Sequence, residues 1–595
     1  MIVRWSDKVT GLSSRGVANS AGTRLIANRN AARSREGILP KAKYDAVVVG
    51  GGHHGSIIAC YLAAAGLKVA VFERRAQIGG GATSRKGPAS GFLMNICAHW
   101  TRFYGHPAYR DFDLGVEGLR YVFPDENEGM VFEDGSSYIG YSAYRVVDYA
   151  IGRQEYSQHN VDRTRKQIAN FSQRDADTYL DCLDKYTKYW KPAFSKHRFT
   201  PPPPWGTPDP LEALVGRPET GIEPVYQFMT VRQLAYEFFE SPELRTLFMR
   251  ACATSTGCYS DDVMGLNGLL HVLPLVLSFE PPAIAVGASQ SLTDALTAAG
   301  RKREVEYFTQ SEVDQILISG KRATGIRLKN GTTVNADIVV SNLGLPQTIL
   351  RLMRDVSIEP KVERRLRNIH YDRSQIFWLN IALHEPPAYT AAKANPGVGP
   401  QPRLLWGPKD PDYLATRYQP EMFLHGHAKR LYAYTSVDTI WDPSRAPMGQ
   451  HLVGVEEFAA PRRVFNDAQW KKIKSSLKKN LIEQWQKYAP NMTPDNVIAA
   501  HIVAPDDVEK LHPDNIEGGY SQGSTIASQM GRYRPAPGLS SYRTLLDNVY
   551  NCSSNLHSGS GIGRGSSYNC FQVMASELGL KFPTPPPAKE TSPKS

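Results

Sequence analysis

Three glycines near residue 50 are spaced for contact with a phosphate-bearing ligand. Residues 50–55 read GGGHHG, which satisfies G-x-G-x-x-G, and they follow the apolar, β-branched run 44–49. The apolar residues that come next keep helical spacing, so a helix should begin here with its free N–H groups toward an anion. Gly50 would allow the tight turn, Gly52 a close approach of backbone to pyrophosphate, and Gly55 close helix–strand packing. The pattern predicts a dinucleotide-binding strand–turn–helix unit.

An acid and a second glycine turn follow this unit. Residues 68–72 are typical of the next strand, and Glu73 comes about 20 residues after the first glycine, where a carboxylate accepts from ribose hydroxyls. Its charge would repel a 2′-phosphate, which disfavours NADP. Arg74, Gly80 and Gly81 belong to an R-x4-G-G arrangement that can brace the far side of a pyrophosphate. These residues favour FAD over NAD, and a solvated arginine pair before a flexible loop is the alternative.

The C-terminal region has a similar local pattern. Residues 548–552 are typical of a short strand, 553–565 read SSNLHSGSGIGRG, and 567–580 are typical of a helix. No G-x4-G-K-[ST] is present, so a separate phosphate site is not indicated. A loop that closes over the isoalloxazine ring of the same cofactor explains the segment better, and a plain glycine turn is the alternative.

A middle segment also fits a cofactor domain. Residues 283–337 contain a loop and a helix, followed by a small meander with a hairpin turn at 329–332. Such a meander often packs on a flavin-binding sheet. The strands expected here are 305–308, 325–328 and 337–340.

Four segments of the chain occur together in one known family. They read VVVGGGHHG, ERRAQIGG, EVDQILISGKRATGIRLKNGTTVNADIVVSN and YRTLLDNVYNCSSNLHSGSGIG. In them the chain resembles the phytoene desaturase / carotenoid isomerase-like flavoproteins, and most closely the pyridine nucleotide-disulfide oxidoreductase domain-containing protein 2 group. The resemblance covers roughly residues 44–585. It implies an α/β fold, with non-covalent FAD in a Rossmann-like domain of the glutathione-reductase type and an inserted α+β substrate domain.

The resemblance also implies which residues contact FAD. By motif position these are Gly50, Gly52, Gly55, Glu73, Arg74, Gly80, the backbone of Val313, Ser553, Gly561 and Ile562. His54 and Gly81, which lie in the same two glycine turns, are also expected to contact the cofactor. The family pattern C-G-x-x-x-H-P-G-G-G is altered here, because Ser553 replaces its first glycine and Ser558 replaces its proline. This change in the loop beside the flavin leaves the substrate and the direction of the reaction open.

The motifs divide the chain into seven segments. The FAD-binding domain is expected from three pieces, 44–140, 283–345 and 540–585. Two long inserts separate them: 141–282, which is helical, and 346–539, which has strands and helices, and together they would form a substrate domain with an apolar chamber against the flavin. A basic leader or disordered extension (1–43) and a tail (586–595) complete the chain. The helices and strands expected in the inserts are 161–189, 231–252, 376–383, 430–437, 451–458 and 467–488.

Charge is concentrated at the N-terminus. The net charge is +11, but residues 1–43 alone hold nine lysines and arginines against two acids, so the body is nearly neutral and nucleic acid is not an expected partner. The leader composition suits a mitochondrial transit peptide, which would place the protein in the matrix; a disordered extension, or a start codon assigned too far upstream, would leave it cytoplasmic. No segment is long and apolar enough to span a membrane. The nearest, 266–279, favours a core or tunnel-lining helix over a membrane-surface patch, although peripheral membrane contact stays open.

The cysteines and the single dinucleotide motif limit the chemistry. None of the seven cysteines forms a CxxC, so neither a dithiol relay nor a metal site is indicated. No second strand–GxGxxG–helix unit is present for NAD(P)H, which argues against a disulfide reductase. Electrons taken from a substrate are expected to pass to oxygen, a quinone or a protein.

The catalytic side chains are harder to assign. His557 is placed near the flavin by the loop motif, and Tyr568 begins the last helix; both are candidates, although each could be structural. Four other side chains are candidate bases, with a structural role as the alternative for each: His271, Asp261, Asp262 and Glu456. The expected function is an FAD-dependent dehydrogenase or desaturase that takes hydride from a C–C or C–N bond of a hydrophobic small molecule. The alternatives are a flavin-bearing scaffold with little turnover and a non-redox isomerase that uses reduced FAD.

Overall fold

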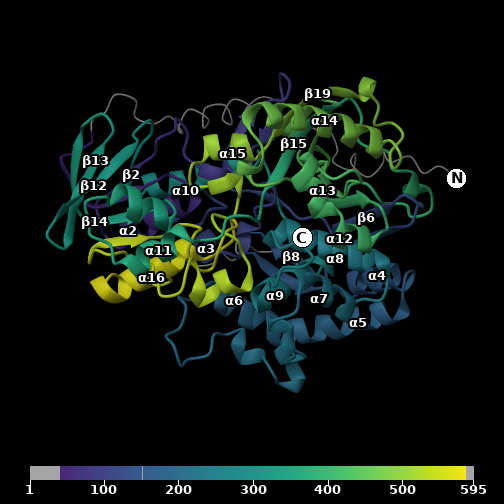
Figure 1. The fold of residues 1–595 in the computed structure, drawn as a ribbon, viewed down its shortest axis with the longest axis horizontal. Coiled ribbons are helices and arrows are strands. Elements are labelled where there is room, and N and C mark those ends of the chain that lie inside the picture. Colours follow the sequence, from purple (N-terminus) through teal and green to yellow (C-terminus); the bar gives the residue numbers. More distant parts are fainter. Residues whose placement is uncertain (1–39, 150–151, 585–595) are drawn as a thin grey trace, which may run out of the picture. The chain divides into compact units, whose positions relative to one another are not determined.

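The computed structural model describes residues 40–149 and 152–584, which form two large sheets with helices around them (Figure 1). The first sheet has the strand order β11-β2-β1-β14-β13-β12, and β20 also pairs with β14. Its strands are β1 (Lys43–Val49), β2 (Val69–Phe72), β11 (Glu306–Phe308), β12 (Val313–Ser319), β13 (Arg322–Leu328), β14 (Thr333–Ser341) and β20 (Val549–Asn551). Most of the expected leader, and the tail, lie outside the described residues.

The centre of this sheet is parallel. β1 lies between β2 and β14 and runs parallel to both, and β11 and β20 continue the parallel set. β12 and β13 add the antiparallel meander, with the hairpin turn at 329–332, where Gly331 has a φ of +89°. The predicted α/β, Rossmann-like fold class is confirmed.

The first strand begins one residue earlier than the apolar run suggests. Lys43 pairs in register with Asn335, and the Ala42 carbonyl accepts a hydrogen bond of 2.9 Å from the Asn335 N–H. Backbone pairing, which does not need an apolar side chain, extends the strand to this exposed lysine. The last residues of the expected leader therefore belong to the folded body.

Three helices cover this sheet: α2 (His53–Ala64), α10 (Gln290–Arg301) and α16 (Ser566–Leu578), at the left in Figure 1. Both α10 and α16 pack against α2. Because it is flanked in this way, α2 is buried on nearly all sides, including Ile57, Ile58 and Leu62. The helix next to the glycine motif is thereby fixed by segments from the middle and the end of the chain.

The second sheet has the order β19-β15-β18-β17-β16-β6-β7, and all neighbours are antiparallel except β16 and β6. Its strands are β6 (Glu126–Phe132), β7 (Ser137–Tyr141), β15 (Ile376–Leu383), β16 (Arg403–Gly407), β17 (Ala433–Ser436), β18 (His451–Phe458) and β19 (Val497–Val503). One face is covered by α14 (Asp467–Trp485), whose Trp470 and Trp485 pack on Phe377 and Trp406. β6 and β7 belong to this sheet, although β6 precedes the boundary expected at residue 140 and β7 spans it. The domain limits as a whole stay a prediction.

Both long helices expected in the first insert are broken. The segment 161–189 divides where Ser172 caps a new helix by accepting from a backbone N–H, and 231–252 divides at Ser241, which caps a helix with Pro242 in its first turn. The helices observed are α4 (Gln158–Ala169), α5 (Gln173–Lys185), a π-helical turn (Tyr186–Trp190), α6 (Lys191–Arg198), α7 (Val231–Phe238), α8 (Pro242–Thr256) and α9 (Gly265–Val276).

Shorter elements complete the described chain, and none of its helices is long and apolar enough to cross a membrane. These elements are β3 (Ser84–Lys86), β4 (Leu93–Asn95), α3 (Pro107–Asp111), β5 (Tyr121–Val122), β8 (Tyr144–Asp148), β9 (Arg153–Tyr156), β10 (Ile284–Ala285), α11 (Pro360–Arg367), α12 (Pro411–Thr416), α13 (Tyr418–His425) and α15 (Pro505–Leu511).

Candidate functional site

A cavity of about 890 Å³ connects the first sheet to the helical insert. One portion of its wall is formed by the two glycine turns after β1 and β2. Other portions come from α6, α9, β15, β18, the segments 97–105 and 511–525, and the C-terminal loop before α16. All three expected pieces of the cofactor domain and both inserts therefore contribute residues to one cavity.

The two glycine turns pack directly on each other. The Gly79 N–H donates to the Gly51 carbonyl at 2.9 Å, and a Cβ at Gly80 would lie 3.1 Å from the Gly52 Cα. A Cβ at Gly55 would lie only 2.1 Å from the Gly50 carbonyl oxygen, so no other residue fits there. α2 begins at this point with no side-chain cap and no acid in its first turn, which leaves its N–H groups for an anion. These features fit the pyrophosphate of FAD.

Two backbone hydrogen bonds hold the Glu73 carboxylate in place, as binding of a ribose would require. It is buried and lines the cavity, with Oε2 accepting from the Gly51 N–H at 2.9 Å and Oε1 from the Arg75 N–H at 2.9 Å. Burial raises the pKa of Glu73, and the two backbone N–H groups oppose that shift. Each carboxylate oxygen keeps further lone pairs that could accept from ribose hydroxyls.

Most of the expected cofactor-contacting residues line this cavity. Gly55 and Ser553 do not: Gly55 lies behind the turn against Gly50, and the Ser553 hydroxyl is turned to the Asn551 side chain at 2.7 Å. The residues that line it are Gly50, Gly52, His54, Glu73, Arg74, Gly80, Gly81, Val313, Gly561 and Ile562.

The two serines that depart from the family pattern are used within the loop. Ser553 also accepts from the Asn555 N–H at 3.3 Å, and the Ser558 hydroxyl accepts from the Gly565 N–H at 2.8 Å. Gly565 is the N-cap of α16, so Ser558 satisfies a backbone donor at the start of that helix. The altered loop is thus held by its own side chains.

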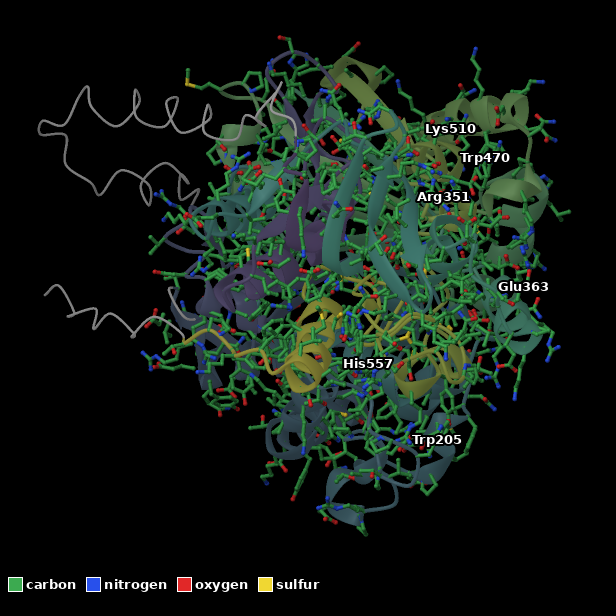
Figure 2. All side chains as sticks on the ribbon, turned by 90° about the vertical axis from the view of Figure 1, so that its left-hand side faces the viewer. Trp205, Arg351, Glu363, Trp470, Lys510 and His557 are labelled. Carbon is green, nitrogen blue, oxygen red and sulfur yellow. The ribbon has the colours of Figure 1, made fainter. Side chains whose placement is uncertain are left out.

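His557 lies outside the cavity wall, where the yellow C-terminal segment meets the blue helical insert (Figure 2). It is fully buried, and its Nε2–H donates to the His197 carbonyl at the end of α6 at 2.7 Å. Burial lowers the pKa of His557 to about 3 and the neighbouring His197 adds to that shift, so the ring is neutral at ordinary pH. These contacts fit a structural role for His557, and its expected catalytic role stays a prediction.

The carbonyls of Arg198, the last residue of α6, and of Phe199, its C-cap, are also bound by the C-terminal segment. Asn569 donates to the Arg198 carbonyl at 3.1 Å, and Gln572 donates to the Phe199 carbonyl at 2.9 Å. A Cβ at Gly565 would lie 2.3 Å from the same Arg198 oxygen. The unpaired carbonyls at the end of α6 are therefore satisfied by the loop and first turns of α16. We call this contact the α6–α16 junction.

Tyr568 is likewise turned away from the cavity. Its ring packs at 5.6 Å from Tyr61, 6.2 Å from Phe199 and 5.9 Å from Phe582, and it does not line the wall. An aromatic cluster between α2 and α16 explains its position better than a catalytic role does.

Two of the four alternative bases do reach the cavity. His271 on α9 and Glu456 on β18 line it, whereas Asp261 is exposed and Asp262 pairs with Arg373 at 2.7 Å. Burial raises the pKa of Glu456, but it lowers the pKa of His271 far below its usual value, with surrounding arginines adding to the effect.

Beyond the predicted Arg74 and its neighbour Arg75, sequence reasoning missed five arginines that line the cavity, which are Arg102, Arg198, Arg351, Arg403 and Arg564. Arg403 pairs with Glu128 at 2.7 Å. Arg564 was readable in principle as the single cation of the loop at 553–565. Arg198 was not, because basic residues at a helix end are usually explained by the helix dipole.

Comparisons with known proteins agree with this geometry. A family model described as FAD dependent oxidoreductase matches residues 45–177. The chain is 24% identical over 558 residues to a limonene dehydrogenase subunit of Castellaniella defragrans (90% of this chain, 95% of that protein). It is also 24% identical over 565 residues to pyridine nucleotide-disulfide oxidoreductase domain-containing protein 2 of Mus musculus (90% and 94%). A solved putrescine oxidase is similar in fold, with a TM-score of 0.56, 14% identity and coverage of 91% and 99%.

Proposed function

Because this chain is an FAD-dependent oxidoreductase, we propose that it is a dehydrogenase or desaturase that takes hydride from a C–C or C–N bond of a hydrophobic small molecule. One observation carries the proposal: the cavity continues from the glycine turns into a chamber with apolar and aromatic walls, including Leu270, Pro274 and Trp378. A relative named for the dehydrogenation of limonene supports this substrate class.

When bound, FAD supplies a two-electron acceptor that takes hydride from carbon. The proton that leaves the neighbouring atom needs an acceptor in the protein, and Glu456 is the carboxylate among the bases expected from the sequence that lines the cavity. Among the described residues, the Glu456 Oε1 has no hydrogen-bond partner, and the side chain lines the cavity. Its raised pKa makes it a stronger base than an ordinary carboxylate. The lowered pKa of His271 makes that ring a weak base, better suited to hydrogen bonding.

We further propose that the electrons pass to oxygen, a quinone or a protein, since the sequence has one dinucleotide motif only. NADPH or NADH should then reduce the flavin slowly or not at all. Rapid stoichiometric reduction by NADPH in a stopped-flow trace would contradict this electron route.

The decisive test is an anaerobic screen of apolar alkenes, alkanes and amines against the purified, FAD-loaded protein while flavin absorbance is followed. A true substrate should bleach the flavin, and oxygen or a quinone should restore the colour. Persistent colour with every ligand that binds would favour a flavin-bearing scaffold. Turnover that needs pre-reduced FAD and gives no net oxidation would favour an isomerase.

For location we propose the mitochondrial matrix, on the Arg- and Ser-rich, acid-poor composition of residues 1–43. Fusion of these residues to a fluorescent protein tests it. A diffuse cytoplasmic signal would contradict the matrix location and favour the cytoplasmic alternative.

A further inference from the structure

Two arginines of the cavity make neither an ion pair nor a side-chain hydrogen bond within the part of the chain that the structure describes. Arg198 is the last residue of α6, and Arg564 lies in the loop just before α16. Their guanidinium carbons lie 4.8 and 5.6 Å from the ring centroid of Phe194, so both cations approach the same ring. Among the residues that the structure describes, neither guanidinium group makes a hydrogen bond or an ion pair. The charge of Glu280 also acts on Arg198, but that carboxylate is paired with Lys191 at 2.8 Å.

Buried arginines elsewhere in the described chain have partners. Arg403 pairs with Glu128 and Arg445 with Asp438, and Arg250 and Arg534 donate hydrogen bonds to backbone carbonyls. Arg564 is only 8% exposed, and burial together with the neighbouring arginine of α6 lowers its pKa to about 9. A buried charge without a partner is unfavourable, so an anion from outside the chain would stabilise Arg564 and the half-buried Arg198 near it.

The charges of the cofactor do not meet this need. The pyrophosphate of FAD has its own cradle at the two glycine turns and the start of α2. The oxidised isoalloxazine ring carries no net charge. Arg198 and Phe194 belong to α6 of the helical insert, and the Phe194 ring stacks on His271 of α9 at 6.0 Å. The insert, rather than the cofactor sheet, therefore supplies most of this cluster.

We propose that the substrate is an amphipathic molecule with a carboxylate head group, bound between Arg198 and Arg564 while its apolar chain lies along α9 in the chamber. This inference rests on the proposed function, because it takes the chamber as the substrate site. It narrows the substrate from any apolar molecule to an anionic one. The α6–α16 junction would support this site, because its three hydrogen bonds hold the helix end that carries Arg198.

The test is a titration of the FAD-loaded protein with decanoate, decan-1-ol and acetate, followed by the flavin difference spectrum. Decanoate should bind at least about tenfold more tightly than decan-1-ol, the size expected for charge-assisted hydrogen bonds, and acetate should bind weakly because it has no chain. R198Q should remove most of the preference for decanoate, and R198K should keep some of it. K196Q is the matched control, because Lys196 lies on the same helix, is exposed and does not line the cavity.

Equal binding of decanoate and decan-1-ol to the wild type would overturn the inference. So would an R198Q protein that loses FAD, or whose flavin midpoint potential falls without ligand, since the guanidinium would then serve the cofactor. If R198Q does not fold, R564Q provides the same comparison. Bleaching by limonene, with no effect of R198Q, would refute the carboxylate but keep the dehydrogenase. If decanoate binds tightly and depends on Arg198, but no compound reduces the flavin, the carboxylate site would stand and the proposed dehydrogenase would be refuted.

Discussion

The cavity has two walls that are built by different means. The cradle comprises residues 50–55, Glu73 and residues 79–81, and its turns are made of backbone packed on backbone. A Cβ added at Gly55 would lie 2.1 Å from the Gly50 carbonyl oxygen. The chamber, which comprises the lining residues of α6, α9, β15 and β18, is made of side chains brought from distant segments. A cradle of this kind should lose FAD binding when one carbon atom is added at such a glycine. A chamber of side chains should instead respond by degrees, according to which group is removed.

The largest effect is expected from G55A. The added methyl would meet the Gly50 carbonyl, and neither backbone can move without opening the turn, so the purified protein should contain no FAD. The FAD released on denaturation, per mole of protein, measures this. G344A is the matched control, because a Cβ there meets nothing closer than 3.9 Å; full FAD content in G55A would show that the turn is not the cofactor site.

The next largest effect is expected from E456Q in the chamber. If Glu456 accepts the proton, the rate of flavin reduction by substrate should fall by about 10²–10⁴-fold with FAD content unchanged. The wild-type rate should rise as pH increases through the raised pKa of Glu456, because only the ionised carboxylate accepts a proton, and E456Q should lack this rise. A raised pKa also means that the carboxyl stabilises the fold below its unfolded pKa and loses that contribution as pH rises through the folded value. E456Q should therefore be no less stable than the wild type at neutral pH.

A smaller effect is expected from E73A in the cradle. Loss of a charge-assisted hydrogen bond to the ribose should weaken FAD binding by about 1–3 kcal/mol. Titration of the apoprotein with FAD provides the dissociation constant. E73Q keeps an acceptor and should lose less, whereas unchanged affinity in both variants would remove Glu73 from the ribose site.

His557 tests the α6–α16 junction. H557L leaves the buried His197 carbonyl without its donor, which should cost about 1–3 kcal/mol in the free energy of unfolding, while H557Q keeps an N–H and should lose less. Because its folded pKa is about 3, His557 contributes stability fully above its usual value of 6.5 and loses it as pH falls toward 3. Denaturant unfolding at several pH values measures both. Loss of flavin reduction in a stable H557Q would restore a catalytic role.

The smallest effect is expected from Y568F. The Tyr568 ring packs in an aromatic cluster outside the cavity, and phenylalanine keeps the ring. The free energy of unfolding should change by less than about 0.5 kcal/mol, and the rate of flavin reduction should be unchanged. A rate that falls tenfold or more would make Tyr568 a catalytic residue after all.

The same contrast explains what could be predicted from the sequence. The cradle is local: a strand, a glycine turn, a helix and an acid lie within about 30 residues, and each has a steric or electrostatic reason that a sequence shows. The chamber depends on contacts between segments 360 residues apart, such as His557 with His197. No periodicity in the sequence predicts that the end of α6 contacts the start of α16. Helix breaks at Ser172 and Ser241 were missed for a simpler reason, because a capping serine inside a helical pattern resembles an ordinary polar position.

The α6–α16 junction also sets an order of assembly during synthesis. Arg198 leaves the ribosome about 360 residues before the side chains that hold its helix end. β1 is likewise synthesised long before its partner β14, and β14 before its own partner β20 (Val549–Asn551), which is the last strand of the sheet. We therefore expect capture of FAD to be a late event that requires nearly the whole chain, and a nascent or truncated product that ends before Val549 should be colourless. The yellow colour of a preparation should then report completed chains and measure how much of the product has finished folding.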